Sequence, residues 1–283
     1  MPVEITAHFQ DIQLNNLIGS GSYGDVYEAK WQTQGREKCI AVKIIRNNSQ
    51  VSESEKKKCK DDLRREIRNL QKFYHTNIVQ LYGVSKDGNN RICLLLEHAD
   101  CGSLHYFLHV TKKKKVTVVH KLNWMVQCAR ALEYLHKNKT FHRDLKPQNM
   151  LLYHNYCTLK LCDFGTVKQI RTNNTTGTGT YGYMAPEVAD ASSKYTEICD
   201  VFSYGIVFWE VMSRKKPFYD SEIKDPISIQ KNLLQGKRPN IQDMKLNKDF
   251  NYLIKLIELC WNTKADMRPS MRSIANGLTN ILI

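Results

Sequence analysis

The sequence predicts an α+β protein in which a mostly β region precedes a mostly α region. In the first third, short runs of β-favouring residues are separated by turns that contain glycine or polar residues. The remainder carries apolar residues at helical spacing. The chain has 283 residues, which is enough for one large domain or two lobes with an ample core. Ligands usually bind in a cleft between two lobes, so we expect a binding site there.

The β region contains five predicted strands and one helix. The strand segments are QLNNLIG, GDVYEAKW, KCIAVKII, NIVQLYGV and RICLLLEHA, and SKDGNN forms the turn between the last two. Before the fourth strand, residues 53–74 place Leu63, Ile67, Leu70 and Tyr74 at helical spacing. The sequence therefore predicts a five-stranded sheet with one helix.

Two helices dominate the predicted α region. The first carries an apolar stripe made of Leu122, Met125, Val126, Ala129, Leu132 and Leu135. The second, residues 200–212, has the sequence DVFSYGIVFWEVM and is apolar nearly all round. This pattern is typical of a helix at the centre of a folded unit, so we expect its whole circumference to be buried.

The cysteine usage indicates a reducing compartment. The nine cysteines are odd in number and include no Cys-x-x-Cys pair, so we expect neither a disulfide framework nor a zinc site, and a cytoplasmic location. The start, MPVEITAHFQDIQL, lacks the pattern of a signal peptide. No stretch approaches the roughly 18 apolar residues of a membrane span, so none is expected.

The net charge of +14 comes from 42 basic and 28 acidic residues. One interpretation is a protein that binds nucleic acid or acidic lipid, which would show a contiguous basic face and salt-sensitive binding. However, the basic residues are spread along the chain apart from runs at 56–58 and 112–115, and such runs are usually solvated. We therefore favour an enzyme with a basic surface that handles phosphates, and expect no nucleic-acid partner.

The segment IGSGSYGDV places Gly19, Gly21 and Gly24 between two predicted strands. Glycine lets backbone N–H groups approach a phosphate closely. A dinucleotide-binding turn of this pattern would need a helix next, whereas DVYEAKW reads as a strand. The sequence therefore favours a hairpin that covers phosphates, with a plain hairpin turn as the alternative.

Lys43 and Glu66 are both charged residues in apolar surroundings. Lys43 shares one strand face with Ala41 and Ile45, and Glu66 lies within the apolar stripe of the helix. A buried charge is unfavourable unless it is paired. We therefore predict a Lys43–Glu66 ion pair.

The segment FHRDLKPQNMLL concentrates groups suited to phosphate chemistry. Asp144 can orient a hydroxyl or accept its proton, and Lys146 can neutralise charge near a phosphate. Asn149 and the later Asp163, in LKLCDFGT, supply oxygens that suit Mg²⁺. His142 is interpreted as a packed core histidine rather than a ligand.

The order of these motifs resembles that of a eukaryotic protein kinase over about residues 12–280. The matching elements are GSGSYGDV, AVK, the helix with Glu66, HRDLKPQN, DFG, APE and DMRP. The resemblance implies a short extension at 1–11, a mostly β N-lobe at 12–97 and a mostly α C-lobe at 98–280. It also implies a buried structural ion pair between Glu187 and Arg268.

HRDLKPQN is similar to the serine/threonine type, whereas CDVFSYGIVFWEV and CWNTKADMRPSM resemble the tyrosine-kinase-like group. LEHADCGSL, LKLCDFGT and RKKPF resemble the transforming-growth-factor-β-activated kinase branch of the MAP kinase kinase kinases. Three residues depart from that pattern: His98 for the usual hinge tyrosine, Leu96 for a methionine, and Tyr183 for a tryptophan. The long regulatory tail of that branch is not in the chain, so partners bound by the tail are not expected.

The resemblance implies a transferase that moves the γ-phosphate of Mg-ATP to a serine or threonine hydroxyl. Asp144 would be the base, Lys146 would contact the γ-phosphate, and Lys43, held by Glu66, would bind the α- and β-phosphates. Asn149 and Asp163 would bind the metal. The implied nucleotide contacts are Ile18, Gly19, Ser20, Gly21, Ser22, Gly24, Val26, Ala41, Lys43, Leu96, Glu97, Ala99, Leu151 and Cys162.

Regulation and partners are implied by the same resemblance. Thr172, Thr175 and Thr180 match hydroxyl residues linked to activation, and phosphate there would pair with Arg143. For Thr180 we favour a structural hydrogen bond to the catalytic aspartate and lysine. The implied substrates are MAP kinase kinases, and the implied activator is a protein on the C-lobe. A pseudokinase scaffold with the same fold is the alternative, and the complete catalytic set argues against it.

Overall fold

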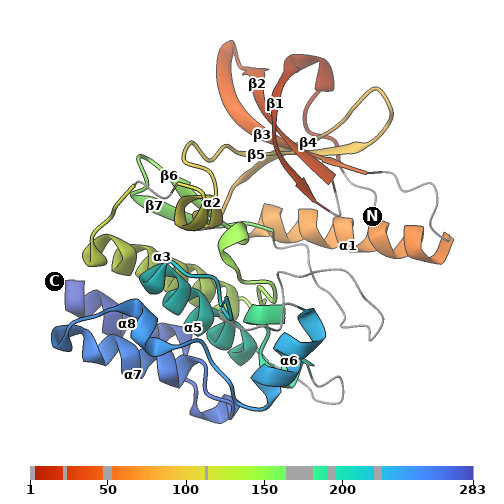
Figure 1. The fold of residues 1–283 in the computed structure, drawn as a ribbon. Helices are drawn as coiled ribbons and strands as arrows, with labels where there is room; N and C mark the ends of the chain where they lie inside the picture. The colour runs from red at the N-terminus through yellow and green to blue at the C-terminus, as the bar shows by residue number, and fades with distance from the viewer. Residues whose placement is uncertain are drawn as a thin grey trace. The chain divides into compact units, whose positions relative to one another are not determined.

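The computed structural model describes residues 4–21, 24–46, 53–111, 114–163, 181–189, 196–219 and 225–282. The chain divides into two compact units. The sheet unit comprises Met1–Asp100 and Asp163–Gly165, and the helical unit comprises Cys101–Cys162 and Thr166–Ile283 (Figure 1). A β-rich unit followed by a helical unit confirms the α+β class that the sequence predicts.

The sheet unit is a five-stranded antiparallel sheet with strand order β1-β2-β3-β5-β4. Its elements are β1 (Ile12–Gly21), β2 (Gly24–Thr33), β3 (Arg36–Ile45), α1 (Glu53–Lys72), β4 (Leu81–Lys86) and β5 (Ile92–Glu97). Because side chains alternate along a strand, Ile40, Val42 and Ile44 of β3 join the core on one face. Ala41 and Lys43 lie on the opposite face, which carries the candidate site.

The end of α1 corrects one prediction. The helix ends at Lys72, and Tyr74 is 81% exposed rather than part of the buried stripe. Phe73 takes the buried position instead, with 4% exposure. Helical spacing extended past the end of the helix therefore assigned the wrong aromatic residue to the core.

The fourth strand is displaced from its predicted position: it begins at Leu81, after NIVQ, and runs to Lys86, so it includes the first two residues of the predicted turn SKDGNN. A turn precedes it: the Ile78 N–H donates to the His75 carbonyl oxygen at 3.1 Å, and the Asn77 N–H donates to the His75 Nδ1 at 3.0 Å. Ile78 and Val79 are nevertheless 2% exposed. Ile78 and Val79 are apolar because they are buried at a turn, and this apolar run resembled a strand in the sequence.

The helical unit contains a small hairpin and seven helices within the described ranges. They are α2 (Leu104–His109), α3 (Val118–Lys137), β6 (Met150–Tyr153), β7 (Thr158–Leu161), α4 (Pro186–Ala189), α5 (Ile198–Ser213), α6 (Pro226–Leu234), α7 (Asn251–Cys260) and α8 (Met271–Leu282). Side-chain oxygens of Ser103, Thr117 and Asp225 cap α2, α3 and α6 by accepting backbone N–H groups. These caps explain why the three helices begin where they do.

Helices α3 and α5 form the core of the helical unit (Figure 1). All six residues of the predicted α3 stripe are buried, and so is every α5 residue from Cys199 to Met212, which confirms both predictions. Gly205 lets α5 approach α7 closely, since an added Cβ would lie 2.8 Å from the Cβ of Cys260. A larger residue there would force the two helices apart.

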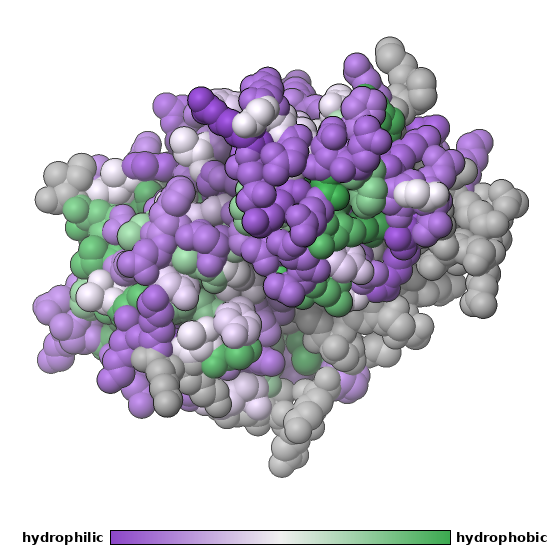
Figure 2. Space-filling view, turned by 90° about the horizontal axis from the view of Figure 1, so that it is seen from above, coloured by the Kyte–Doolittle hydropathy of each residue, from purple (hydrophilic) through white to green (hydrophobic). Residues whose placement is uncertain are grey.

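The surface is mostly polar on the face shown in Figure 2, with small hydrophobic patches between hydrophilic side chains. Within the described ranges, no helix combines the length and hydrophobicity needed to cross a lipid bilayer. The cysteines that the structure describes are free thiols.

Lys121 on α3 is expected to make stability depend on pH. Burial, and secondly the charge of Arg214, lower the pKa of Lys121 from 10.5 to about 8. Its Nζ donates to the Met212 carbonyl oxygen at 3.0 Å. Between these two pKa values the unfolded chain binds more protons than the folded chain, so the free energy of unfolding rises with pH across that window.

The Lys121→Met variant should lose this rise, which urea unfolding at several pH values between 8 and 10.5 would measure. The control is Lys255→Met, because Lys255 is an exposed lysine on α7. It should keep the pH dependence of the parent protein. Parallel curves for the parent and Lys121→Met would contradict the prediction.

Candidate active site

Lys43 and Glu66 form the ion pair that the sequence predicts. Strand β3 places Lys43 on the sheet face opposite the core, and α1 carries Glu66 towards it. The Lys43 Nζ lies 2.9 Å from the Glu66 Oε1 and 3.4 Å from the Asp163 Oδ1. The side chains of Lys43 and Glu66 are only 14% and 10% exposed. One ammonium group therefore contacts two carboxylates in a largely desolvated position.

The group formed by Lys43, Glu66 and Asp163 contains one basic and two acidic side chains. Burial acts to lower the pKa of Lys43, but the carboxylates of Asp163 and Glu66 outweigh it and raise that pKa above its ordinary value. Lys43 thus stays protonated. Two carboxylates against one ammonium leave an excess of negative charge, which a divalent cation at Asp163 would compensate. The donor set therefore fits the implied magnesium.

Asp163 follows β7 and has a left-handed backbone conformation, with φ of 63°. Aspartate is among the few residues that adopt this conformation readily, yet it still costs about 1–3 kcal/mol. Its side chain is 29% exposed and contacts Lys43. This backbone conformation places a carboxylate oxygen of Asp163 against Lys43, the lysine predicted to bind phosphate.

The glycine segment forms the hairpin between β1 and β2. The register pairs Gly19 with Val26 and Gly21 with Gly24, so a strand follows the glycines, as expected. Gly24 is required by packing, because an added Cβ would lie 2.2 Å from the Ile44 carbonyl oxygen. At Gly21 an added Cβ would meet no atom of the described residues within 4 Å, so close packing among them does not explain that glycine.

Several predicted nucleotide contacts share one face of the sheet. Val26 pairs with Lys43 across β2 and β3, and Ala41 pairs with Leu96 across β3 and β5. Residues directly opposite each other in an antiparallel sheet project from the same face. Ile18, Gly19 and Ser20 lie on β1, Glu97 ends β5 and Ala99 follows it.

The remaining predicted nucleotide contacts lie elsewhere. Leu151 lies on β6 and Cys162 follows β7, both in the helical unit. Cys162 is partly exposed. Ser22 lies outside the described residues, as do Thr172, Thr175 and Thr180.

Asp144, Lys146 and Asn149 form a second polar group, in the helical unit. The Lys146 Nζ lies 2.7 Å from the Asp144 Oδ2. The Asn149 Nδ2 donates to the same oxygen at 3.1 Å and to the Asp144 backbone oxygen at 2.8 Å. Within the described ranges, the Asp144 Oδ1 is buried and has no hydrogen-bond partner. One oxygen of this carboxylate is therefore anchored, and the other can accept a hydrogen bond from a hydroxyl.

The loop that carries Asp144 is held by Asp200, a residue that the sequence analysis quoted but did not assign. Asp200 is fully buried on α5 and accepts the backbone N–H groups of His142 and Arg143, each at 2.8 Å. The His136 Nε2 lies 2.9 Å from its Oδ2. Burial acts to raise the pKa of Asp200, but these contacts outweigh it and lower that pKa. The sequence signal for a role of Asp200 was its position as one of two acidic residues in a helix that is apolar nearly all round.

His142 itself is 2% exposed, and its Nε2 contacts the Cys162 carbonyl oxygen at 3.1 Å. It is a packed residue, as interpreted from the sequence. The Cys162 N–H donates to the Asn149 carbonyl oxygen at 3.0 Å, which links the residue before Asp163 to the segment that carries Asp144 and Asn149.

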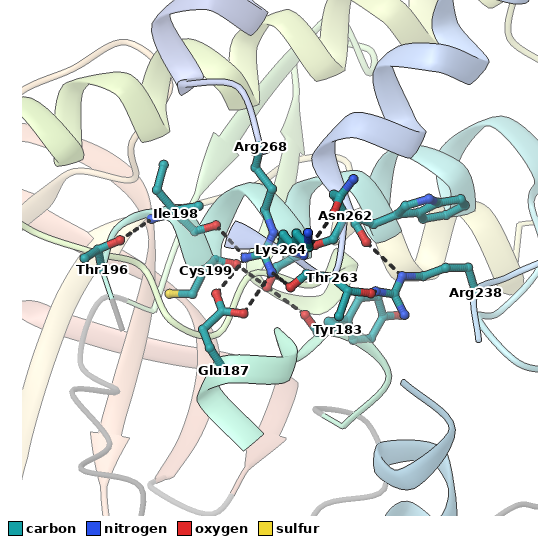
Figure 3. Close-up of polar contacts among 12 residues, drawn as sticks. Tyr183, Glu187, Thr196, Ile198, Cys199, Arg238, Asn262, Thr263, Lys264 and Arg268 are labelled. Atoms are coloured by element: carbon teal, nitrogen blue, oxygen red, sulfur yellow. Dashed lines mark hydrogen bonds and ion pairs between the residues drawn. The ribbon is translucent and has the colours of Figure 1, made fainter. Parts of the chain in front are cut away.

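Glu187 and Arg268 make the structural ion pair that was expected. The Arg268 Nη1 lies 2.6 Å from the Glu187 Oε1, and the Nη2 lies 2.8 Å from the Oε2 (Figure 3). Arg268 also donates to the Asn262 carbonyl oxygen at 2.8 Å. The Arg268 side chain is 0% exposed and that of Glu187 is 18% exposed, so a largely buried ion pair connects α4 to the segment before α8.

Tyr183, which departs from the expected tryptophan, has a specific partner. Its hydroxyl donates to the Glu210 Oε2 at 2.6 Å, and the His109 Nε2 lies 2.7 Å from the Glu210 Oε1. Glu210 is fully buried on α5. The N–H of a tryptophan would lie at a different position from the Tyr183 hydroxyl. The hydrogen bond to Glu210 therefore depends on tyrosine at this position.

Comparison with known proteins agrees with this geometry. The protein kinase domain family matches residues 12–277. A protein named Mitogen-activated protein kinase kinase kinase 7 is 39% identical in Drosophila melanogaster and 38% identical in Homo sapiens, each over 97% of this chain. The Caenorhabditis elegans protein named Mitogen-activated protein kinase kinase kinase mom-4 is 32% identical over 94% of this chain.

The chain spans 38% of the fly protein, 42% of the human protein and 47% of the nematode protein. These similarities agree with the branch that the sequence motifs resemble. The family match covers nearly the whole chain and includes both polar groups described above. The chain therefore belongs to the protein kinase domain family.

Proposed function

We propose that this chain is a serine/threonine protein kinase domain, spanning residues 12–280, that transfers the γ-phosphate of ATP to protein hydroxyls. The observation that carries the proposal is the arrangement at Asp144. Its Oδ2 is anchored by Lys146 at 2.7 Å, whereas its buried Oδ1 has no partner among the described residues. A substrate hydroxyl would donate to that oxygen and then transfer its proton to it.

The two polar groups have different roles in this proposal. Lys43, kept protonated and fixed by Glu66, binds the α- and β-phosphates. Lys146 contacts the γ-phosphate and offsets its charge. Positioning and charge stabilisation are the main tasks of a phosphate-transfer enzyme, because its transition state is loose.

Asn149 and Asp163 are the residues that would hold Mg²⁺. The Asn149 amide nitrogen is used in two hydrogen bonds to Asp144, so its oxygen is the atom left for a hard cation. When bound, magnesium would neutralise charge on the nucleotide phosphates. Asp144 itself keeps its unpartnered oxygen for the hydroxyl.

The substrates in this proposal are MAP kinase kinases, supported by the names of the similar proteins. An activator protein on the helical unit and control by phosphate on Thr172, Thr175 or Thr180 complete the proposal as predictions. A cytoplasmic location is supported by the free thiols.

The test is an ATP-dependent phosphorylation assay on a panel of MAP kinase kinases. The parent should place phosphate on serine or threonine of at least one of them. Lys43→Arg should lose this transfer, because arginine cannot reproduce a single ammonium between two carboxylates. Lys86→Arg, at an exposed lysine on β4, is the matched control and should keep it. A parent that binds ATP without transferring phosphate would support the scaffold alternative instead.

A further inference from the structure

Glu28, Cys39 and His98 form a cluster of metal-binding side chains in the sheet unit, and the proposed kinase activity uses none of them. One ligand atom from each residue lies within 4.8 Å of the other two. Glu28 and His98 are partly exposed, and Cys39 is exposed. We propose that this cluster is a binding site for a zinc ion.

The sheet register explains why three distant residues meet. Ile40 pairs with Glu97 across β3 and β5, so the next position of the antiparallel ladder sets Cys39 beside His98. Glu28 pairs with Ala41 across β2 and β3, which makes it the diagonal neighbour of Cys39 on the same face. Strands β2 and β3 thus contribute one ligand each, and the third, His98, directly follows the end of β5 at Glu97.

The spacing of the ligands is close to that of a zinc site. The Cys39 Sγ lies 3.9 Å from the Glu28 Oε1. Two ligands at zinc bond lengths of about 2.3 and 2.1 Å in tetrahedral geometry lie about 3.6 Å apart. The Cys39–Glu28 separation therefore needs to shorten by only about 0.3 Å, and all three ligand atoms already lie within 4.8 Å of one another.

The chemistry of the ligands selects zinc over the magnesium of the proposed active site. Thiolate and imidazole favour zinc and related ions, whereas magnesium prefers oxygen ligands. Three protein ligands leave one coordination position for water.

The charge of the cluster also suits a cation. Burial, and secondly the Glu28 carboxylate, raise the pKa of the Cys39 thiol. On binding, a zinc–sulfur bond forms, and the thiol proton is released to solvent. The charge of Lys30 acts against this rise in the pKa of Cys39, but Lys30 is paired with Glu37 at 2.9 Å, so its charge is partly offset.

Cobalt(II) titration of the whole chain, freed of metal by a chelator, tests the proposal. Cobalt takes zinc sites and shows a thiolate charge-transfer absorption when a cysteine is a ligand. One equivalent should bind, and zinc should displace it. Cys39→Ser should abolish the absorption, and Glu28→Gln and His98→Ala should weaken binding at least about 10-fold.

The matched control is Cys157→Ser, at an exposed cysteine in the helical unit. It should bind cobalt as the parent does. Zinc should also raise the melting temperature of the parent and of Cys157→Ser, because a ligand that binds the folded state stabilises it. It should not raise that of Cys39→Ser. Equal cobalt affinity in the parent, Glu28→Gln and Cys39→Ser, or equal loss in Cys157→Ser, would overturn the proposal.

Discussion

Asp144→Asn is expected to lower the rate of phosphate transfer by about 10²–10⁴-fold and to leave nucleotide binding unchanged. The amide has nearly the same shape as the carboxylate but cannot accept the proton of the substrate hydroxyl. Nucleotide binding should persist because the lysine assigned to the phosphates, Lys43, belongs to the sheet unit and keeps both carboxylate partners. Rapid-quench kinetics would measure the transfer step, and a fluorescent nucleotide would measure binding.

The control is Asp266→Asn, which makes the same chemical change at an exposed position. It should retain the rate of the parent. Because Asp144 is also the partner of Lys146, thermal unfolding of both variants should be recorded to show that the fold survives. Transfer at the parent rate by a folded Asp144→Asn protein would reject the assignment of Asp144 as the proton acceptor.

Glu187→Gln is expected to lower the free energy of unfolding by about 3–5 kcal/mol, the usual effect of breaking a buried ion pair. The Arg268 guanidinium is 0% exposed and would remain charged, because arginine does not lose its proton in proteins. It would keep its hydrogen bond to the Asn262 carbonyl oxygen but lose its counter-charge. Urea unfolding of the parent and the variant would measure the difference.

Two further variants test whether the pair itself is the cause. Arg272→Ala removes an exposed arginine on α8 and should change stability by less than about 0.5 kcal/mol. The double variant Glu187→Gln/Arg268→Met should lose less than the sum of its two single variants, since each single variant breaks the same interaction. Simple additivity would show that the two residues stabilise the fold independently.

The sequence determined the features that depend on local pattern. Helical spacing located α3 and α5 and identified their buried faces, because a period of about 3.6 residues can be recognised from residues that are close together in the sequence. The Lys43–Glu66 pair was also predictable, because a lone charge in an apolar strand and a lone charge in an apolar helix face each need a partner. The same local reasoning failed at Tyr74, where the spacing continued but the helix had ended.

The candidate site was predictable in its residue types and less so in its supports. Motif order identified Asp144, Asn149 and Asp163. The role of Asp200 could not be read from that order, because it binds backbone N–H groups of a loop far away in the sequence. The partner of Tyr183 could not be predicted for the same reason. Glu210 is a charged residue in an apolar helix, and only the fold places it within hydrogen-bond distance of Tyr183.

The cluster of Glu28, Cys39 and His98 shows the same limit most clearly. Sequence spacing argued against a zinc site, because the chain contains no Cys-x-x-Cys pair. Strand pairing nevertheless brings together Glu28 of β2, Cys39 of β3 and His98, which directly follows β5. Periodicity and motif spacing record which residues are neighbours along the chain, whereas strand register and helix packing decide which become neighbours in space. The fold class could therefore be predicted from the sequence, together with the residue types of the candidate site, whereas the meeting of distant polar groups depends on the tertiary structure.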